Sequence, residues 1–299
     1  MTTADSIRTA EAQEATAVVP ARSPRRNGSR RATRNPSAVG AATASAILLL
    51  FLGLPVVVLV LRATFGGTLL AATSDRAVLD ALGLSLATTL VSIFVVVLLG
   101  TPLAYALARH EFRGKWLAES IVDLPIVLPP SVAGLALLLA FGRRGALGPA
   151  LDLAGLTIPF TSLAVVLAQV FVAAPFFIRA ARAGFRSVDL DLEDAARVDG
   201  AGGMATFRFV TLPLAAPAVS AGLVLAWARA LGEFGATIMF AGNFAGTTQT
   251  LPLLVYSQFQ SSLDASVAAA SVLVLAAFGV LVAVRLTHWR GALDIRITG

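Results

Sequence analysis

Six long apolar segments constrain this chain more than any other feature. A helix needs about 20 apolar residues to cross ~30 Å of hydrocarbon at 1.5 Å per residue. The six segments run over residues 41–61, 82–108, 124–141, 160–178, 214–231 and 265–284. Membrane-spanning strands would instead alternate in character over about ten residues, and the sequence has no such pattern. The sequence therefore predicts an all-α membrane protein, a bundle of six transmembrane helices.

The composition also indicates a lipid environment. Hydrophobic residues make up 57% of the 299 residues and charged residues 13%, whereas soluble domains carry about 25% charged residues. The absence of cysteine excludes a disulfide scaffold and a thiolate-ligated metal site. The net charge of +6 lies mostly beside the apolar segments, so it does not indicate a nucleic-acid partner.

The two ends of the chain differ from its apolar part. Residues 1–40 are rich in Ala, Ser, Thr, Pro and Arg and lack apolar periodicity, which predicts a disordered basic tail. The pair Arg30–Arg31 would also fit a twin-arginine export signal, but the apolar run that follows has membrane-spanning length and favours an uncleaved first span. We expect a membrane domain over residues 41–290 and a short tail over residues 291–299.

Basic residues lie mostly on one side of the predicted membrane. The flanks on that side carry eighteen Lys and Arg residues, and the opposite flanks carry four: Arg62, Arg76, Arg143 and Arg144. Cytoplasmic flanks are enriched in Lys and Arg. We therefore expect a multi-pass protein of the plasma or inner membrane, with both termini and the loop over residues 179–212 in the cytoplasm.

The loop between the fourth and fifth apolar segments is charged and rich in alanine. It is predicted to form a helix, a turn and a second short helix, with Ser187 as the N-cap of the first helix. Gly200, Gly202 and Gly203 are expected to break the first helix. Pro213 suits the beginning of the next spanning helix.

The spacing of residues in this loop resembles that of importer permeases of the ATP-binding-cassette superfamily. Their loop reads Glu-Ala-Ala, three residues, Gly, nine residues, then Ile-x-Leu-Pro, and this chain has Asp for the Glu and Val for the Ile. The resemblance implies coupling helices that dock on a cytoplasmic ATPase, whereas the alternative is an ordinary amphipathic loop helix. The implied coupling residues, within a loop at about 186–212, are Glu193, Asp194, Ala195, Ala196, Gly200, Val210, Leu212 and Pro213.

The chain carries no catalytic motif for nucleotide hydrolysis. A phosphate-binding Walker loop needs Gly-Lys followed by Ser or Thr, and the single lysine, Lys115, lies between Gly114 and Trp116. His110 and His288 have no carboxylate cluster that would make a metal site or a catalytic triad. We therefore expect a non-catalytic subunit that binds no cofactor, with ATP and Mg bound by the partner ATPase.

The C-terminal part of the resemblance bears on the cargo. From about residue 80 onward the chain is similar to the molybdate and sulfate branch of these permeases. Molybdate permeases are resembled most at the following positions: Gly235, Ala236, Thr237, Ile238, Asn243, Gly246, Thr248, Thr250, Pro252 and Tyr256. The resemblance implies import of molybdate, with tungstate accompanying it, and sulfate or thiosulfate as the alternative. It also implies a homodimer, a dimeric ATPase, an extracytoplasmic oxyanion-binding protein and alternating access.

Several residues are candidates for the translocation path or its gate. Arg229 and Glu233 are ionisable residues within an apolar stretch, where such residues usually face a bundle interior. The alternative is an ion pair on the helix surface, four residues apart. Prolines interrupt the third apolar segment, and small residues beside them suit either helix packing or a gate. The complete candidate set is Pro129, Pro130, Ser131, Arg229, Glu233 and Thr237.

A different class of function, a secondary anion transporter, would need other features. It would carry coupling carboxylates in mid-span and an internal inverted repeat, and the sequence has neither. An intramembrane enzyme would need a nucleophile and a base together, which are also lacking.

Overall fold

The computed structural model describes the backbone of residues 36–297 and the side chains of residues 40–282. It divides into two units, residues 1–52 and 53–299, and each is described by itself. The described part of the first unit is the beginning of helix α2 (Pro36–Phe65), in which residues 40–52 are exposed. Most of the predicted tail, residues 1–35, lies outside the described residues. Helix α2 begins five residues before the predicted start of the first span.

The described part of the second unit is helical and contains no strand. After α2 come α3 (Thr68–Ala72), α4 (Arg76–Arg109), α5 (Lys115–Val127), α6 (Pro130–Phe141), α7 (Gly148–Leu153), α8 (Ser162–Ser187), α9 (Leu190–Val198), α10 (Gly203–Thr206), the π-helical turn η1 (Phe207–Thr211), α11 (Leu212–Leu231), α12 (Gly235–Phe240), α13 (Leu251–Phe259) and α14 (Leu263–Ile297). The all-α class predicted from the sequence is confirmed.

Five of the described helices are long and apolar enough to cross a membrane. They are α2, α4, α8, α14 and the continuous helix formed by α10, η1 and α11, and they cover five of the six predicted spans. The backbone of α14 stays helical as far as Ile297, through most of the predicted C-terminal tail.

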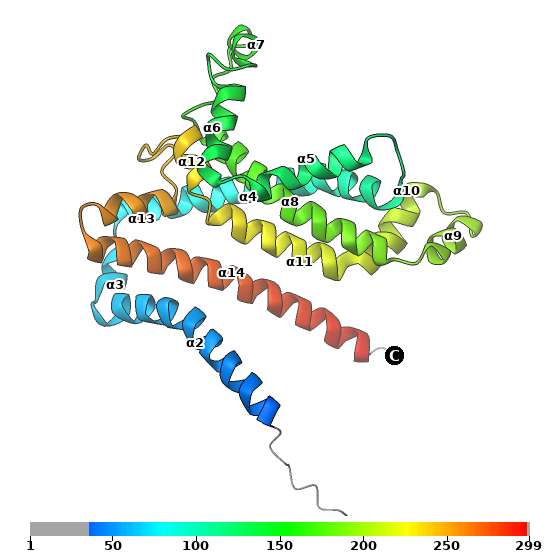
Figure 1. Ribbon diagram of the computed structural model, residues 1–299, viewed down its shortest axis with the longest axis horizontal. Coiled ribbons are helices and arrows are strands. Elements are labelled where there is room, and N and C mark those ends of the chain that lie inside the picture. Colours follow the sequence, from blue (N-terminus) through cyan, green and yellow to red (C-terminus); the bar gives the residue numbers. More distant parts are fainter. Residues whose placement is uncertain (1–35, 298–299) are drawn as a thin grey trace, which may run out of the picture. The chain divides into compact units, whose positions relative to one another are not determined.

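The third predicted span is not one continuous helix, and the predicted interruption by prolines is confirmed. It is divided into α5 and α6, and α6 leaves the direction of α5 at a steep angle (Figure 1). A proline disfavours helical backbone in the residue before it. Leu128 precedes Pro129, which in turn precedes Pro130, and both Leu128 and Pro129 have extended ψ angles of 130° and 136°. The two consecutive prolines therefore end one helix and begin another.

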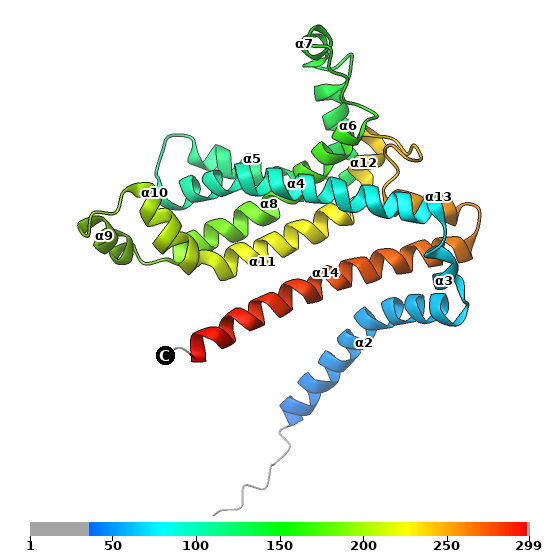
Figure 2. The same cartoon turned by 180° about the vertical axis from the view of Figure 1, so that it is seen from behind.

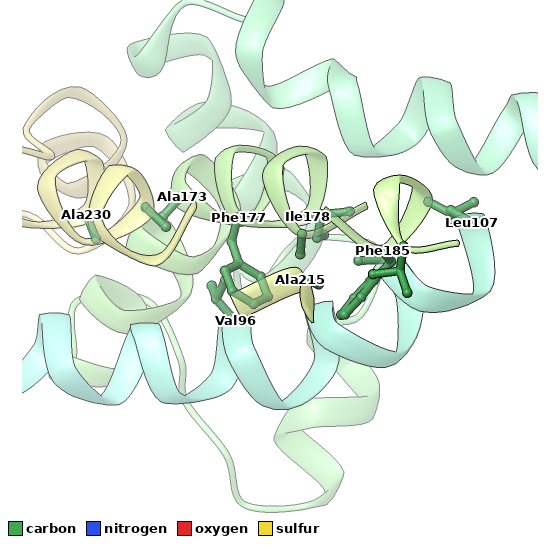
Figure 3. Packing of buried hydrophobic residues seen from close by; sticks show 12 residues of the cluster. Val96, Leu107, Ala173, Phe177, Ile178, Phe185, Ala215 and Ala230 are labelled. Atoms are coloured by element: carbon green, nitrogen blue, oxygen red, sulfur yellow. The ribbon is translucent and has the colours of Figure 1, made fainter. Parts of the chain in front are cut away.

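The centre of the second unit is helix α8, which lies beside α4 and α11 (Figures 1 and 2). Figure 3 shows Phe177 and Phe185 of α8 packed near Val96 of α4 and Ala215 of α11. Small residues let α8 and α11 approach closely. The space is so narrow that a Cβ atom added to Gly222 would lie only 2.7 Å from the Cβ of Ala180.

Buried hydroxyl groups add polar contacts between α4 and α8. Ser92 Oγ donates to Gln169 Oε1 at 2.9 Å, and Gln169 Nε2 donates to Thr89 Oγ1 at 3.3 Å. All three side chains are buried. Polar groups of this kind hydrogen-bond between helices because lipid offers them no partner. They set the alignment of α4 against α8.

Helices α6 and α12 pack closely enough to make a testable prediction. A Cβ atom on Gly134 would lie 2.6 Å from the backbone oxygen of Ala236 and 2.7 Å from the Cβ of Met239. Because backbone must shift to make room, we expect Gly134→Ala to lower the free energy of unfolding by about 1–3 kcal/mol. The matched control is Gly83→Ala on α4, where the new Cβ meets nothing within 4 Å. This substitution should raise the free energy of unfolding by about 0.5–1 kcal/mol, because alanine favours helical backbone more than glycine does. Thermal unfolding in lipid nanodiscs measures both, and equal midpoints would contradict the prediction.

Candidate coupling site and translocation path

The candidate coupling helix is α9, which follows α8 after a short extended connection. Its N-cap is Asp189, whose Oδ1 accepts a hydrogen bond from the Asp191 backbone N–H at 3.1 Å. The prediction that Ser187 is the N-cap is wrong, because this residue ends α8 and its hydroxyl donates to the Gly184 carbonyl at 2.8 Å. Val188 has extended backbone between the two helices, so the cap falls at Asp189, two residues later than predicted.

Glu193 attaches α9 to the membrane helices. Its Oε1 accepts hydrogen bonds from Arg109 Nη2 at 2.6 Å and from Thr211 Oγ1 at 2.7 Å. The same Arg109 nitrogen donates to the Val188 carbonyl at 3.0 Å. Arg197 Nη2 lies 3.5 Å from the other carboxylate oxygen. We call the contact of Arg109, Glu193 and Thr211 the clamp, because it joins the end of α4, helix α9 and the turn η1.

The clamp is shielded from solvent. The side chain of Glu193 is 1% exposed and that of Arg109 is 9% exposed. Burying two charges is costly, and their attraction offsets that cost only when the geometry is good and further hydrogen bonds are made. The Thr211 hydroxyl and the Val188 carbonyl supply those hydrogen bonds. The clamp therefore holds α9 in one orientation relative to α4 and η1.

The opposite side of α9 is exposed. Asp194 points outward and accepts a hydrogen bond from Arg197 at 2.5 Å. Ala195 is exposed and Ala196 is half-buried. Three apolar side chains are also open to solvent: Leu190, Leu192 and Val198. The two adjacent acidic residues thus have different surroundings, Glu193 within the protein and Asp194 on the free surface.

Gly200 ends α9 in the way that its predicted role requires. Its φ angle is +92°, in the left-handed region that favours glycine. Gly200 N–H donates to the Arg197 carbonyl at 3.0 Å, and Ala201 N–H donates to the Ala196 carbonyl at 2.9 Å. This pair of hydrogen bonds is a Schellman motif. The predicted breaking role of Gly202 and Gly203 is wrong, because Gly202 has an ordinary φ of −69° and Gly203 begins α10.

This difference between neighbouring glycines gives a second prediction. Gly200→Ala places a Cβ on left-handed backbone, which costs about 1–2 kcal/mol, whereas Gly202→Ala meets no atom within 4 Å and keeps a permitted φ. We expect only the first substitution to speed amide exchange over residues 195–201. Hydrogen exchange followed by mass spectrometry tests this, and faster exchange in both variants would contradict it.

The expected second short helix of the loop is instead the first part of a long helix. Helix α10, the turn η1 and helix α11 run without interruption from Gly203 to Leu231. In η1 the Leu212 N–H donates to the Phe207 carbonyl, five residues back. Pro213 has no N–H and cannot continue the usual ladder, so it is accommodated directly after this turn, as the second residue of α11. Val210 and Leu212 are half-buried.

The candidate path residues lie at two interruptions in the helices. Helix α11 ends at Leu231, and α12 begins at Gly235. Glu233 lies between them, 1% exposed, and its Oε1 accepts a hydrogen bond from the Ala236 N–H at 2.6 Å. Arg229 Nη1 donates to Glu233 Oε2 at 2.5 Å. The pair has the predicted spacing of four residues, but its carboxylate is buried rather than on the helix surface.

The two interruptions meet in space. A Cβ on Gly235 would lie 2.7 Å from the Cβ of Pro130 and 3.2 Å from the Ser131 nitrogen, so the start of α12 touches the start of α6. Ser131, Pro129 and Pro130 are exposed. Thr237 is buried, and its hydroxyl has no hydrogen-bond partner in the described part of the chain. Interrupted helices are tolerated in membranes where they are buried in protein or line a water-filled cavity.

The loop after α12 is held by its own polar side chains. Asn243 Nδ2 donates to Ser257 Oγ at 2.7 Å, and Gln249 Nε2 donates to Asn243 Oδ1 at 3.0 Å. The backbone N–H of Phe244 donates to Thr248 Oγ1 at 3.0 Å. These contacts give a defined shape to a loop that is rich in hydroxyl and amide groups.

Sequence reasoning did not find two members of the clamp. In the sequence Arg109 is one of the eighteen basic residues that flank the spans, and no local pattern predicts a role for Thr211. The contact between Arg109 and Glu193 joins residues 84 positions apart, so no local spacing could indicate it. The available signal was a single arginine at the end of a span beside a loop with an acidic helix.

The clamp, the exposed face of α9 and the two interrupted helices can be compared with known proteins. The sequence profile described as "Binding-protein-dependent transport system inner membrane component" matches residues 97–294. The chain belongs to this family. The matched range contains α9 with its Schellman glycine and both interruptions.

Individual proteins similar to this chain are also transport permeases. The molybdenum transport system permease protein ModB of Mycobacterium tuberculosis is 42% identical over 77% of this chain and 86% of its own length. The sulfate transport system permease protein CysW of Synechococcus elongatus is 42% identical over 64% of this chain and 68% of its own length. A crystal structure of a bacterial ABC transporter involved in import of the polysaccharide alginate matches with a TM-score of 0.64 and 18% identity. The match covers 87% of this chain and 96% of the alginate transporter chain. At 18% identity it shows a similar fold.

Proposed function

We propose that this permease carries molybdate, and with it tungstate, across the plasma membrane into the cytoplasm, driven by a separate ATPase. The observation that carries the proposal is the two-sided arrangement of α9. Glu193 attaches it to α4 and η1 through the clamp, while Leu190, Leu192 and Asp194 are exposed. A docked ATPase that moves this face would move the membrane helices with it.

The proposed assembly has two copies of this chain, a dimeric ATPase that binds ATP and Mg, and an extracytoplasmic oxyanion-binding protein. Residues 41–290 would form the permease domain, and residues 186–212 the coupling loop in the cytoplasm, together with both chain ends. The basic flanks support this orientation because the positive residues collect on that side. The polar loop over residues 241–250 is the proposed contact for the binding protein.

The coupling residues in this proposal have distinct tasks. Glu193 transmits movement inward, Gly200 ends the helix, and Val210, Leu212 and Pro213 join the loop to α11. Asp194, Ala195 and Ala196 lie on or beside the face offered to the ATPase. The interruptions at Pro129–Ser131 and at Glu233–Thr237, with Arg229, are the proposed path or gate, because interrupted helices suit alternating access.

Molybdate is favoured over sulfate by the similarity to a molybdenum permease over more of the chain. The similarity to a sulfate permease keeps sulfate or thiosulfate as the second candidate. The deciding experiment is ATP-driven uptake of labelled molybdate by the complex reconstituted in liposomes, with tungstate and sulfate as competitors. We expect tungstate to compete at equal concentration and sulfate to compete weakly. Stronger competition by sulfate would reverse the assignment of the cargo, and uptake without the ATPase would contradict the mechanism.

A further inference from the structure

A row of arginines on α8 lies outside the clamp and the interrupted helices. Arg179, Arg182 and Arg186 are spaced by three and four residues, which puts them on one face of the helix. Two adjoining hollows open on this face, of about 410 and 250 Å³, and both are lined by Arg182 and Arg186. The larger hollow is also lined by Lys115 and Trp116 of α5.

Acidic side chains of neighbouring segments neutralise most of this charge. Asp123 pairs with Arg179 at 3.4 Å, and Glu119 pairs with Arg182. Lys115 Nζ donates to Glu111 Oε1 at 2.6 Å. Four cations thus face three carboxylates, which leaves one positive charge. Of these four cations, Arg186 has no salt bridge within the described part of the chain, and its side chain is exposed.

Positive charges around Glu111 also affect the pKa of its carboxyl group. The pKa of its carboxyl group is lowered, first by the hydrogen bond from Lys115 and by the charge of that residue, and in addition by the charges of Arg186 and Arg182. Glu111 follows the end of α4, outside the spanning helices. The carboxylate is thus stabilised first by Lys115 and then by the two arginines of the hollow.

The chemistry of these groups suits a tetrahedral oxyanion. A guanidinium group offers a planar fork of N–H donors that matches two oxygens of such an anion. Arg186 is free to offer that fork, and the hollow leaves ample room for an anion of a few ångströms. Because the site is open to solvent and shares its arginines with carboxylates, it would bind loosely. A permeation pathway needs sites that a solute can leave as well as enter.

We propose that this hollow binds a tetrahedral oxyanion through Arg186, with Arg182 and Lys115 beside it, at the end of the bundle where α5 begins and α8 ends. The proposal rests on the proposed function in one respect, since the anion expected there is the imported oxyanion after it leaves the path. The phosphate of an anionic lipid has the same chemistry and is the other source of the ligand. Trp116 is 71% exposed beside the hollow, as aromatic residues at a membrane interface often are.

The test is equilibrium binding of labelled molybdate to the full-length permease in nanodiscs, without ATPase, nucleotide or binding protein. In nanodiscs of phosphatidylcholine we expect saturable binding that weakens as salt rises, and about a tenfold weaker affinity in Arg186→Gln. Arg186→Lys keeps the charge but loses the fork and should be intermediate. The matched control is Arg208→Gln, an exposed arginine of η1 that does not line the hollow, and its affinity should equal that of the wild type.

A second arm identifies the source of the anion. In nanodiscs with phosphatidylglycerol, native mass spectrometry counts the anionic lipids retained by each variant. Lipid retention that depends on Arg186 and excludes molybdate assigns the site to lipid phosphate, whereas molybdate binding that persists assigns it to the cargo. No saturable binding in either membrane, or equal affinities of Arg186→Gln and Arg208→Gln, overturns the site. Failure of ATP-driven molybdate uptake by the wild-type complex would overturn the proposed function and leave this binding result standing.

Discussion

Arg109→Met should abolish ATP-driven import and lower the free energy of unfolding by about 3–5 kcal/mol. The substitution removes one partner of a buried ion pair and leaves the Glu193 carboxylate without its strongest donor, and breaking such a pair costs about this much. The side chain of Glu193 is 1% exposed, so water cannot replace the lost guanidinium. Thermal unfolding in nanodiscs measures the stability, and uptake of labelled molybdate by the reconstituted complex measures import.

A double variant separates coupling from stability. Arg109→Met combined with Glu193→Leu removes both buried charges together, and replacement of a buried pair by apolar residues is often neutral in stability. We expect the double variant to unfold near the wild-type midpoint, to hydrolyse ATP, and still to import at less than a tenth of the wild-type rate. Wild-type import by the double variant would show that the clamp is structural only, and wild-type import by Arg109→Met would contradict both roles.

Arg229→Gln should cost more than Glu233→Gln, although the two substitutions break the same ion pair. The Glu233 side chain is 1% exposed and that of Arg229 is 28% exposed. Arg229→Gln leaves the buried Glu233 carboxylate without a charged partner, which should lower the free energy of unfolding by about 3 kcal/mol. In Glu233→Gln the new amide oxygen can still accept from the Ala236 N–H, and Arg229 can reach water, so about 1 kcal/mol is expected.

Import should follow the same order, because Glu233 positions the start of α12 against Pro130. We expect uptake of labelled molybdate to fall more than tenfold in Arg229→Gln and a few-fold in Glu233→Gln. Unfolding midpoints and uptake rates are measured on the same preparations. If the two variants lose equal stability, the burial argument is wrong. If Arg229→Gln imports at the wild-type rate, the pair has no part in the path.

Much of the fold could be predicted because it depends on local patterns. Apolar length alone located five spanning helices, since the thickness of the membrane sets the length that each must have. The left-handed position at Gly200 was also accessible, because only glycine adopts it at little cost. The interruption of the third segment was also accessible from the sequence, because two consecutive prolines control the backbone there, whereas the direction that α6 takes after them was not.

The same distinction between local patterns and contacts of distant residues applies to the candidate site. A loop of coupling type after the fourth span could be predicted from the sequence, because its spacing of alanines, glycine and proline lies within about twenty residues. The inward direction of Glu193 and the outward direction of Asp194 become visible only in the folded chain, because they depend on Arg109, 84 positions earlier in the chain. The meeting of Pro130 with Gly235 is likewise a contact between distant segments. Side chains far apart in sequence are brought together by packing, and no local periodicity carries that information.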